Sequence, residues 1–215
     1  MKLEEFVSTF NPPDDGKLVT FRNCLIGKSA VVGNHIEKSE GELNMKQSVT
    51  SANTSINKNR MPAVYGKIQL VDGDRVLDYG CGRYTEHLYH HCKEKFAGFF
   101  PFDPFNIPEW KNRLSREQLT NRPATIGIMS NVLNVIDSDE AIRDAISDAL
   151  SLISHCGKLH ITVYEGDKSG VGKYTSVDSF QRNMRLKEYL PLLQGMGFNA
   201  VMQSGTIAIS GTHKF

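Results

Sequence analysis

From residue 75 onward, short apolar runs alternate with amphipathic segments. The expected strands span residues 75–79, 97–103, 124–131 and 158–164. The expected helices span residues 85–96, 139–154 and 179–194. Strands that alternate with helices need crossover connections, which favours a parallel sheet with helices on both faces. Two last runs, 198–203 and 206–210, flank Ser204-Gly205 and predict a closing hairpin. The pattern therefore predicts an α/β doubly wound sheet, mostly parallel with an antiparallel C-terminal hairpin.

Composition limits the class of protein. A chain of 215 residues can bury about 70% of its unfolded surface, which supports one core. Lys and Arg number 25 against 24 Asp and Glu, and this balance argues against a strongly basic nucleic-acid coat protein. No apolar run approaches the ~20 residues that span a bilayer, and the N-terminus has no apolar signal region. The four cysteines form no Cys-x-x-Cys pair. We therefore expect reduced thiols, no metal site, no membrane span and a cytoplasmic protein.

The first 60 residues differ from the rest of the chain. Short apolar pieces at 18–21 and 24–26 could form strands, and residues 44–60 are rich in Ser, Thr and Asn, which suit loops. A helix is expected at 61–68, with Pro62 in its first turn. We predict that residues 1–60 are an N-terminal extension or lid and that residues 61–215 form the main domain.

The segment Val76-Leu77-Asp78-Tyr79-Gly80-Cys81-Gly82 carries the strongest local signal. Gly80 and Gly82 allow the backbone to approach a ligand where a Cβ atom would collide. Asp78 can accept a hydrogen bond from a ligand ammonium group or hold an ordered water. Asp103 ends the next expected strand, 25 residues later, where a carboxylate can accept from two ribose hydroxyls. This spacing predicts a site for a nucleoside-containing ligand.

These residues resemble motif I of class I S-adenosylmethionine-dependent methyltransferases, with Asp103-Pro104-Phe105-Asn106 as the ribose-binding turn. A narrower resemblance, over about residues 54–195, is to the DNA phosphorothioation-associated methyltransferases. The segments that carry it are Asp78 to Arg83, Asp103-Pro104, Asn131 to Ile136, Gly172 to Thr175 and Ser179 to Arg182. The resemblance implies a Rossmann-like fold and S-adenosylmethionine as the cofactor.

The residues expected to bind this cofactor are Asp78, Gly80, Cys81, Gly82, Asp103, Pro104, Phe105, Asn131 and Arg60. Phe105 could stack on the adenine or be an ordinary core aromatic, and Arg60 could close over the cofactor carboxylate. Two departures stand out. Tyr84 occupies the position of the third small residue of the usual motif. No strand ending in an acid is evident between residues 106 and 123, so the usual contact to the adenine amino group is missing or supplied otherwise.

Three residues are candidates for the transfer step. Asn131 and Asn134 follow the third strand, and their amides could orient a target amine or hydroxyl beside the sulfonium methyl; the alternative is a turn or helix cap. Glu165 follows the fourth strand and could be a general base or simply a solvated turn acid. No Asn-Pro-Pro-Tyr or Asp-Pro-Pro-Tyr follows the third strand, and no Pro-Cys pair supplies a cytosine nucleophile.

Basic side chains cluster on both sides of this site. The residues that could contact nucleic-acid phosphates are Lys58, Arg60, Lys173, Arg182 and Arg185. The alternative is a solvated helix face. Three functions remain open: a methyltransferase acting on nucleic acid, with DNA preferred; a small-molecule or protein methyltransferase; and a cofactor-binding module without transfer activity.

Overall fold

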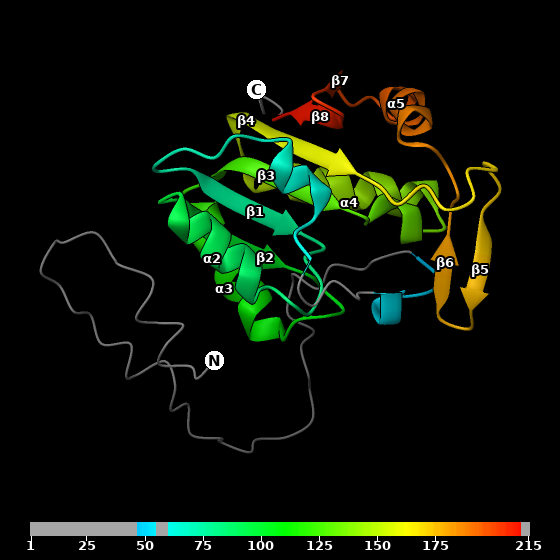
Figure 1. Cartoon of the computed structure of the whole chain (residues 1–215), viewed down its shortest axis with the longest axis horizontal. Helices are drawn as coiled ribbons and strands as arrows, with labels where there is room; N and C mark the ends of the chain where they lie inside the picture. Colours follow the sequence, from blue (N-terminus) through cyan, green and yellow to red (C-terminus); the bar gives the residue numbers. More distant parts are fainter. Residues whose placement is uncertain (1–46, 55–59, 212–215) are drawn as a thin grey trace, which may run out of the picture. The chain divides into compact units, whose positions relative to one another are not determined.

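A six-stranded sheet forms the centre of the computed structural model, which describes residues 47–54 and 60–211 (Figure 1). In chain order its strands are β1 (Arg75–Tyr79), β2 (Gly98–Phe102), β3 (Ala124–Ser130), β4 (Ile153–Thr162), β7 (Ala200–Gln203) and β8 (Thr206–Ser210). Their spatial order is β2-β1-β3-β4-β8-β7. The first four are parallel, and β8 is antiparallel to both β4 and β7. The predicted fold class, including the closing hairpin, is confirmed.

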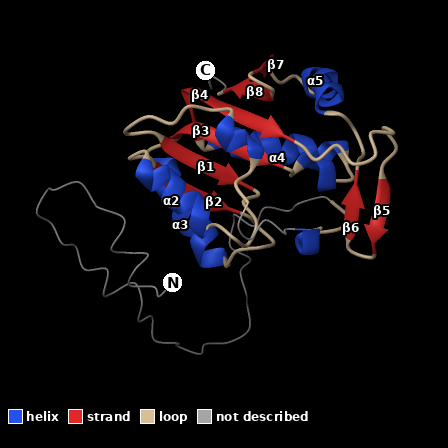
Figure 2. Cartoon of the chain, viewed as in Figure 1, coloured by secondary structure: helices blue, strands red, loops and turns tan. Residues whose placement is uncertain are grey.

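Helices cover both faces of this sheet (Figure 2). They are α2 (Glu86–Glu94), α3 (Glu109–Asn121), α4 (Asp139–Ser151) and α5 (Leu186–Gly195). Side chains alternate along β1, so that Val76 joins a core with Leu88 of α2 on one face. On the other face, Tyr79 donates a 2.9 Å hydrogen bond to Asp148 of α4. The helix α5 packs against β7 and β8.

The start of β4 corrects one boundary. The helix expected at 139–154 instead ends at Ser151, and β4, expected at 158–164, begins at Ile153. Gly157 is needed inside the strand rather than at a helix end, because a Cβ atom there would lie 2.7 Å from the carbonyl oxygen of Thr125 on β3. Cys156 is therefore an exposed strand residue.

The helix expected at 179–194 begins seven residues later, at Leu186. The preceding residues form a separate two-stranded sheet of β5 (Lys173–Ser176) and β6 (Ser179–Gln181), which lies beyond the carboxyl end of β4 (Figure 2). Phe180 packs edge-to-face against Tyr174 across this hairpin. The start of α5 is set by Glu188, whose side chain accepts a 2.8 Å hydrogen bond from the Arg185 amide.

Two further elements differ from expectation. The helix α3 was not predicted, because its apolar stripe is short and only Ser115 and Leu119 are buried. At 61–68 the structure has a single 3₁₀ turn, η3 (Ala63–Gly66), rather than a helix. The helix α3 lies in the connection from β2, which is one edge strand of the sheet, to β3. The strands expected at 18–21 and 24–26 lie outside the described residues. No described helix combines the length and apolarity needed to cross a membrane.

Candidate functional site

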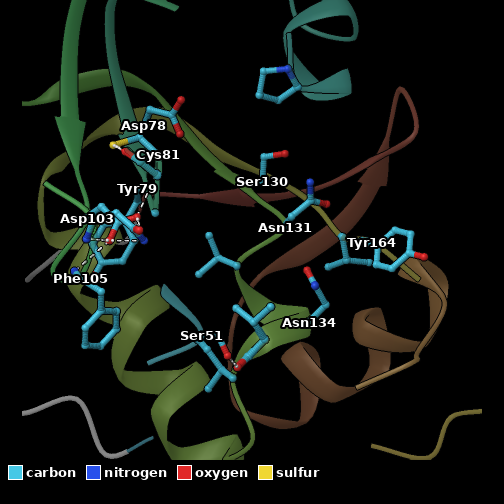
Figure 3. Close-up of a pocket in the computed structure, with 18 of the residues that line it drawn as sticks. Ser51, Asp78, Tyr79, Cys81, Asp103, Phe105, Ser130, Asn131, Asn134 and Tyr164 are labelled. Atoms are coloured by element: carbon cyan, nitrogen blue, oxygen red, sulfur yellow. Dashed lines mark hydrogen bonds between the residues drawn. The ribbon is translucent and has the colours of Figure 1, made fainter. Parts of the chain in front are cut away.

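A pocket of about 880 Å³ opens at the carboxyl ends of β1 and β3. The chain leaves β1 for β2 on one side and then crosses to β3 on the other, so the connections after β1 and β3 diverge here. Such a switch point is where doubly wound sheets bind ligands. Figure 3 shows Asp78 and Asp103 along one side of the pocket and Asn131, Asn134 and Tyr164 along the other.

The glycine turn after β1 is shaped by packing as well as by backbone conformation. Gly80 and Gly82 have φ values of 78° and 72°, in the left-handed region that favours glycine. A Cβ atom on Gly80 would lie 2.3 Å from Cγ2 of Val132. Gly80 therefore lets the loop after β3 pack against the turn. Close approach to Val132 is thus one reason for a glycine at this position, and its predicted contact with a ligand stays a prediction, since Gly80 also lines the pocket.

Asp78 places a buried carboxylate at the end of β1. Its side chain is 2% exposed, and Oδ2 accepts a 2.8 Å hydrogen bond from the Tyr65 hydroxyl. Burial raises the pKa of Asp78 to about 7; the Tyr65 hydrogen bond opposes this rise, and the charge of Asp103 adds to it. Tyr65 is a site residue that the sequence did not reveal, because nothing in its local pattern distinguishes it from a core tyrosine.

Asp103 joins the two turns that border the pocket. Its Oδ2 accepts a 2.9 Å hydrogen bond from the Gly82 amide, and its Oδ1 accepts two of 2.9 Å from the amides of Phe105 and Asn106. The Asn106 side-chain amide also reaches both oxygens, at 3.3 and 3.2 Å. This last donor is the weakest, and it is the one that a ligand hydroxyl could replace. Asn106 belongs to the expected ribose-binding turn, but its side-chain contact to Asp103 was not predicted.

Other predicted cofactor residues also line the pocket. Phe105 is 36% exposed, which answers the open question about it: this ring is not part of the core. Pro104 lies beside it, and Arg60 lines the pocket with an exposed side chain. Tyr84 is 37% exposed and lines the pocket too. Burial raises the pKa of the Cys81 thiol well above its usual value, which keeps it protonated and a poor nucleophile.

The two asparagines after β3 differ in their surroundings. Asn131 is exposed and has φ of 58°, and its backbone amide donates a 2.8 Å hydrogen bond to the Thr162 carbonyl, which extends the pairing of β3 with β4. Asn134 is 2% exposed and lines the pocket. Its Nδ2 donates a 3.1 Å hydrogen bond to Oε1 of Gln181, while its Oδ1 is buried without a hydrogen-bond partner among the described residues.

Glu165 lies outside the pocket lining. Its Oε1 accepts a 2.9 Å hydrogen bond from the Leu186 amide at the start of α5, and its Oε2 lies 3.5 Å from Nζ of Lys168. The Leu186 hydrogen bond is the main cause that lowers the pKa of Glu165, with Lys168 adding to it. The geometry gives Glu165 a role in capping α5, and the general-base interpretation loses its support.

Residues 47–54 pass over one side of the pocket, which Gln47, Thr50 and Ser51 help to line. The Ser51 amide donates to the Asp178 carbonyl at 2.9 Å, and Ser51 Oγ accepts from the Phe180 amide at 3.2 Å. These contacts tie the segment to the β5–β6 hairpin. The lid predicted at 1–60 stays a prediction, since residues 1–46 and 55–59 lie outside the described residues.

The predicted phosphate contacts are partly neutralised. Nζ of Lys173 lies 2.8 Å from Oδ2 of Asp167. The Arg182 side chain is 11% exposed, and its NH1 lies 2.8 Å from Oδ1 of Asp139. Lys58 lies outside the described residues, while Arg185 stands at the start of α5.

No protein-family model matches the chain, and no curated protein matches it. Several solved methyltransferase structures resemble it at low identity. The 1,6-didemethyltoxoflavin-N1-methyltransferase of Burkholderia thailandensis, solved with 1,6-didemethyltoxoflavin and S-adenosylhomocysteine, has 18% identity and a TM-score of 0.46 over 69% of this chain and 72% of that one. A SAM-dependent methyltransferase of Methanosarcina mazei has 13% identity and a TM-score of 0.48 over 72% and 99%. One from Geobacter sulfurreducens, in complex with S-adenosylhomocysteine, has 15% identity and a TM-score of 0.40 over 71% of each chain.

Proposed function

We propose that the chain is an S-adenosylmethionine-dependent methyltransferase. The observation that carries this proposal is the pair of buried carboxylates, Asp78 and Asp103, at the ends of adjacent parallel strands. The left-handed turn at 80–82 lies between them in sequence, and all of these residues line one pocket. One carboxylate suits an ammonium group and the other suits ribose hydroxyls, which matches the polar groups of this cofactor.

The residues present fit the cofactor group by group. Asp78, once ionised, would hold the amino group of the methionine portion, and Arg60 would pair with its carboxylate. Asp103 would accept from the ribose by exchanging the weak Asn106 donor for a hydroxyl. Phe105 offers an exposed ring on which the adenine would stack. The bound cofactor supplies an electrophilic sulfonium methyl group, and the protein positions the acceptor in line with it.

Two classes of acceptor fit this site. The sequence resemblance favours DNA, for which Arg185 offers a phosphate contact, while Arg60 is assigned to the carboxylate of the cofactor. The pairing of Lys173 with Asp167 and of Arg182 with Asp139 removes two of the predicted contacts. This observation favours the second candidate, a small-molecule or protein acceptor that does not need a basic groove.

Calorimetry with S-adenosylhomocysteine tests cofactor use. We expect the wild type to bind and Asp78→Ala to lose at least tenfold in affinity, because the ammonium group loses its partner. Transfer of radiolabelled methyl groups to DNA, RNA, a protein extract and a small-molecule extract then tests the reaction. Tight binding with no labelled acceptor would instead favour a cofactor-binding module. Absence of binding to the wild type would sink the whole proposal.

A further inference from the structure

A chain of hydrogen bonds runs from the main chain after β4 to the pocket. Nε2 of Gln181 donates a 3.0 Å hydrogen bond to the backbone carbonyl of Tyr164. Oε1 of Gln181 in turn accepts from Nδ2 of Asn134 at 3.1 Å. Gln181 is 9% exposed and Asn134 is 2% exposed, so water has little access to replace these bonds.

The backbone carbonyl of Tyr164 decides which atoms in this series of hydrogen bonds donate and which accept. A backbone carbonyl can only accept, so the Gln181 end that faces Tyr164 must be the NH₂ group. The Gln181 oxygen therefore faces Asn134, and Asn134 must answer with its own NH₂ group. The remaining atom, Asn134 Oδ1, is left without a partner and borders the pocket (Figure 3). The orientation of both amides is thus set by the main chain and does not depend on the local assignment of either one.

A buried acceptor without a partner costs about 1–3 kcal/mol. A ligand that donates a hydrogen bond to it recovers this energy, whereas a ligand without a donor does not. We propose that Gln181 is a positioning residue that turns Asn134 Oδ1 toward the acceptor, and that the atom to be methylated is a nitrogen or oxygen that carries a proton. This inference rests on the proposed methyltransferase function and assigns its acceptor chemistry.

The methyl transfer forms one bond, breaks one bond and releases one proton. The lone pair of the acceptor atom forms a bond to the methyl carbon, the carbon–sulfur bond breaks, and its electron pair returns to sulfur to give a neutral thioether. The acceptor nitrogen or oxygen becomes more positive as the bond forms, so its N–H or O–H donates more strongly to Asn134 Oδ1. The proton then leaves to water in the pocket. An asparagine oxygen can stabilise this step without itself taking the proton.

Side-chain amide NMR tests the orientation without any need for turnover. In the wild type with S-adenosylhomocysteine, we expect a nuclear Overhauser contact between the Asn134 amide protons and the Gln181 side chain, with a single χ2 rotamer of Asn134. Gln181→Met removes the acceptor, so the contact should disappear and several χ2 rotamers should be populated. Gln181→Glu loses the NH₂ group that anchors this residue to the Tyr164 carbonyl, so the contact should weaken there as well. Gln203→Met makes the same change on β7, outside the pocket lining, and should alter neither the contact nor the rotamer. Averaging over several Asn134 χ2 rotamers in the wild type would overturn the inference.

The chemistry of the labelled product tests the acceptor class. We expect the methyl group on nitrogen or oxygen, and mass-spectrometric fragmentation of the product distinguishes the two. In Gln181→Met, kcat should fall roughly 10- to 100-fold while the affinity for S-adenosylhomocysteine stays within about twofold, as expected for a lost buried hydrogen bond at the acceptor. A label on sulfur or carbon would contradict the inference and leave the methyltransferase proposal intact. If no acceptor is labelled, the result counts against the methyltransferase proposal. The NMR experiment then tests the orientation of the Asn134 amide independently of transfer.

Discussion

The Tyr65 hydroxyl donates a 2.8 Å hydrogen bond to Oδ2 of Asp78. Both side chains are buried, and the bond joins the η3 turn to the end of β1. Burial raises the pKa of Asp78 to about 7, and the bond from Tyr65 holds it below the value that burial alone would produce. This pair therefore decides at what pH the pocket presents a negative charge to a ligand ammonium group.

The affinity for S-adenosylhomocysteine should depend on pH through Asp78. With a pKa of about 7, Asp78 is mostly protonated at pH 6 and mostly ionised at pH 8. We expect binding at pH 6 to be roughly tenfold weaker than at pH 8, because only the ionised form attracts the ligand ammonium group. Isothermal titration calorimetry across this range measures it. Asp78→Asn should bind weakly at both values, and a persistent pH dependence in that variant would point to another group.

Tyr65→Phe should move this transition to higher pH. The variant loses the hydrogen bond that favours the ionised carboxylate, so the pKa of Asp78 rises further. A lost bond of about 1.4 kcal/mol corresponds to roughly one pH unit in the midpoint of binding. Tyr89→Phe, on α2 and outside the pocket lining, is the matched control and should leave the midpoint unchanged. A shift to lower pH in Tyr65→Phe would show that the hydroxyl does not stabilise the charge.

Stability should depend on pH through the same carboxylate, with a definite sign. The folded-state pKa of Asp78 is raised to about 7, so the folded state binds the proton more tightly than the unfolded chain, where the pKa is about 4. The stabilisation is complete below about pH 4, is lost as the pH rises to about 7, and then stays lost. We expect this contribution to be on the order of 4 kcal/mol, since each pKa unit corresponds to about 1.4 kcal/mol. Urea unfolding of the wild type and of Asp78→Asn measures this. The difference between their free energies of unfolding should change between about pH 4 and about pH 7. A difference that stays constant over this range would show that Asp78 is not the titrating group.

The sequence predicted the parts of this structure that depend on local pattern. The strand and glycine turn at 76–82 are one example, and α4 is another, because its buried residues recur at helical spacing. The β5–β6 hairpin was missed because all four residues of β5 are exposed, so no alternation marks the strand. Pairing with β6 and the packing of Phe180 on Tyr174 decide its conformation instead.

Some residues of the candidate site could also be predicted from local sequence pattern, and others could not. Asp78 and Asp103 could be predicted, since a strand followed by an acid and glycines has a local signature. Tyr65 and Gln181 could not be assigned their roles, because each acts through a partner elsewhere in the chain: Asp78 lies 13 residues from Tyr65, and Asn134 lies 47 residues from Gln181. The roles of such residues depend on how the elements pack, which no local pattern records.

Gly80→Ala should destabilise the fold. The new Cβ atom would lie 2.3 Å from Cγ2 of Val132, and the φ of 78° is strained for alanine. We expect a loss of about 2–4 kcal/mol in the free energy of unfolding, measured by urea denaturation. The double variant Gly80→Ala, Val132→Ala relieves the steric part, so its loss should be smaller than the sum of the two single losses. Simple additivity would show that backbone strain alone accounts for the effect.

Arg116→Met should lower the free energy of unfolding without lowering the affinity for S-adenosylhomocysteine. NH1 and NH2 of Arg116 each lie 2.8 Å from an oxygen of Asp148, which also accepts from the Tyr79 hydroxyl. The Asp148 side chain is 13% exposed, so the variant would leave a mostly buried carboxylate without its cation, at a cost of about 2–3 kcal/mol.

Arg113→Met is the matched control on α3. Its partner Glu117 is 3.9 Å away and both side chains are exposed, so we expect a change below about 0.5 kcal/mol. Urea denaturation measures both losses, and affinity for S-adenosylhomocysteine should stay within about twofold in each variant, because neither arginine lines the pocket. Equal losses in the two variants would contradict the importance of the Asp148 pair.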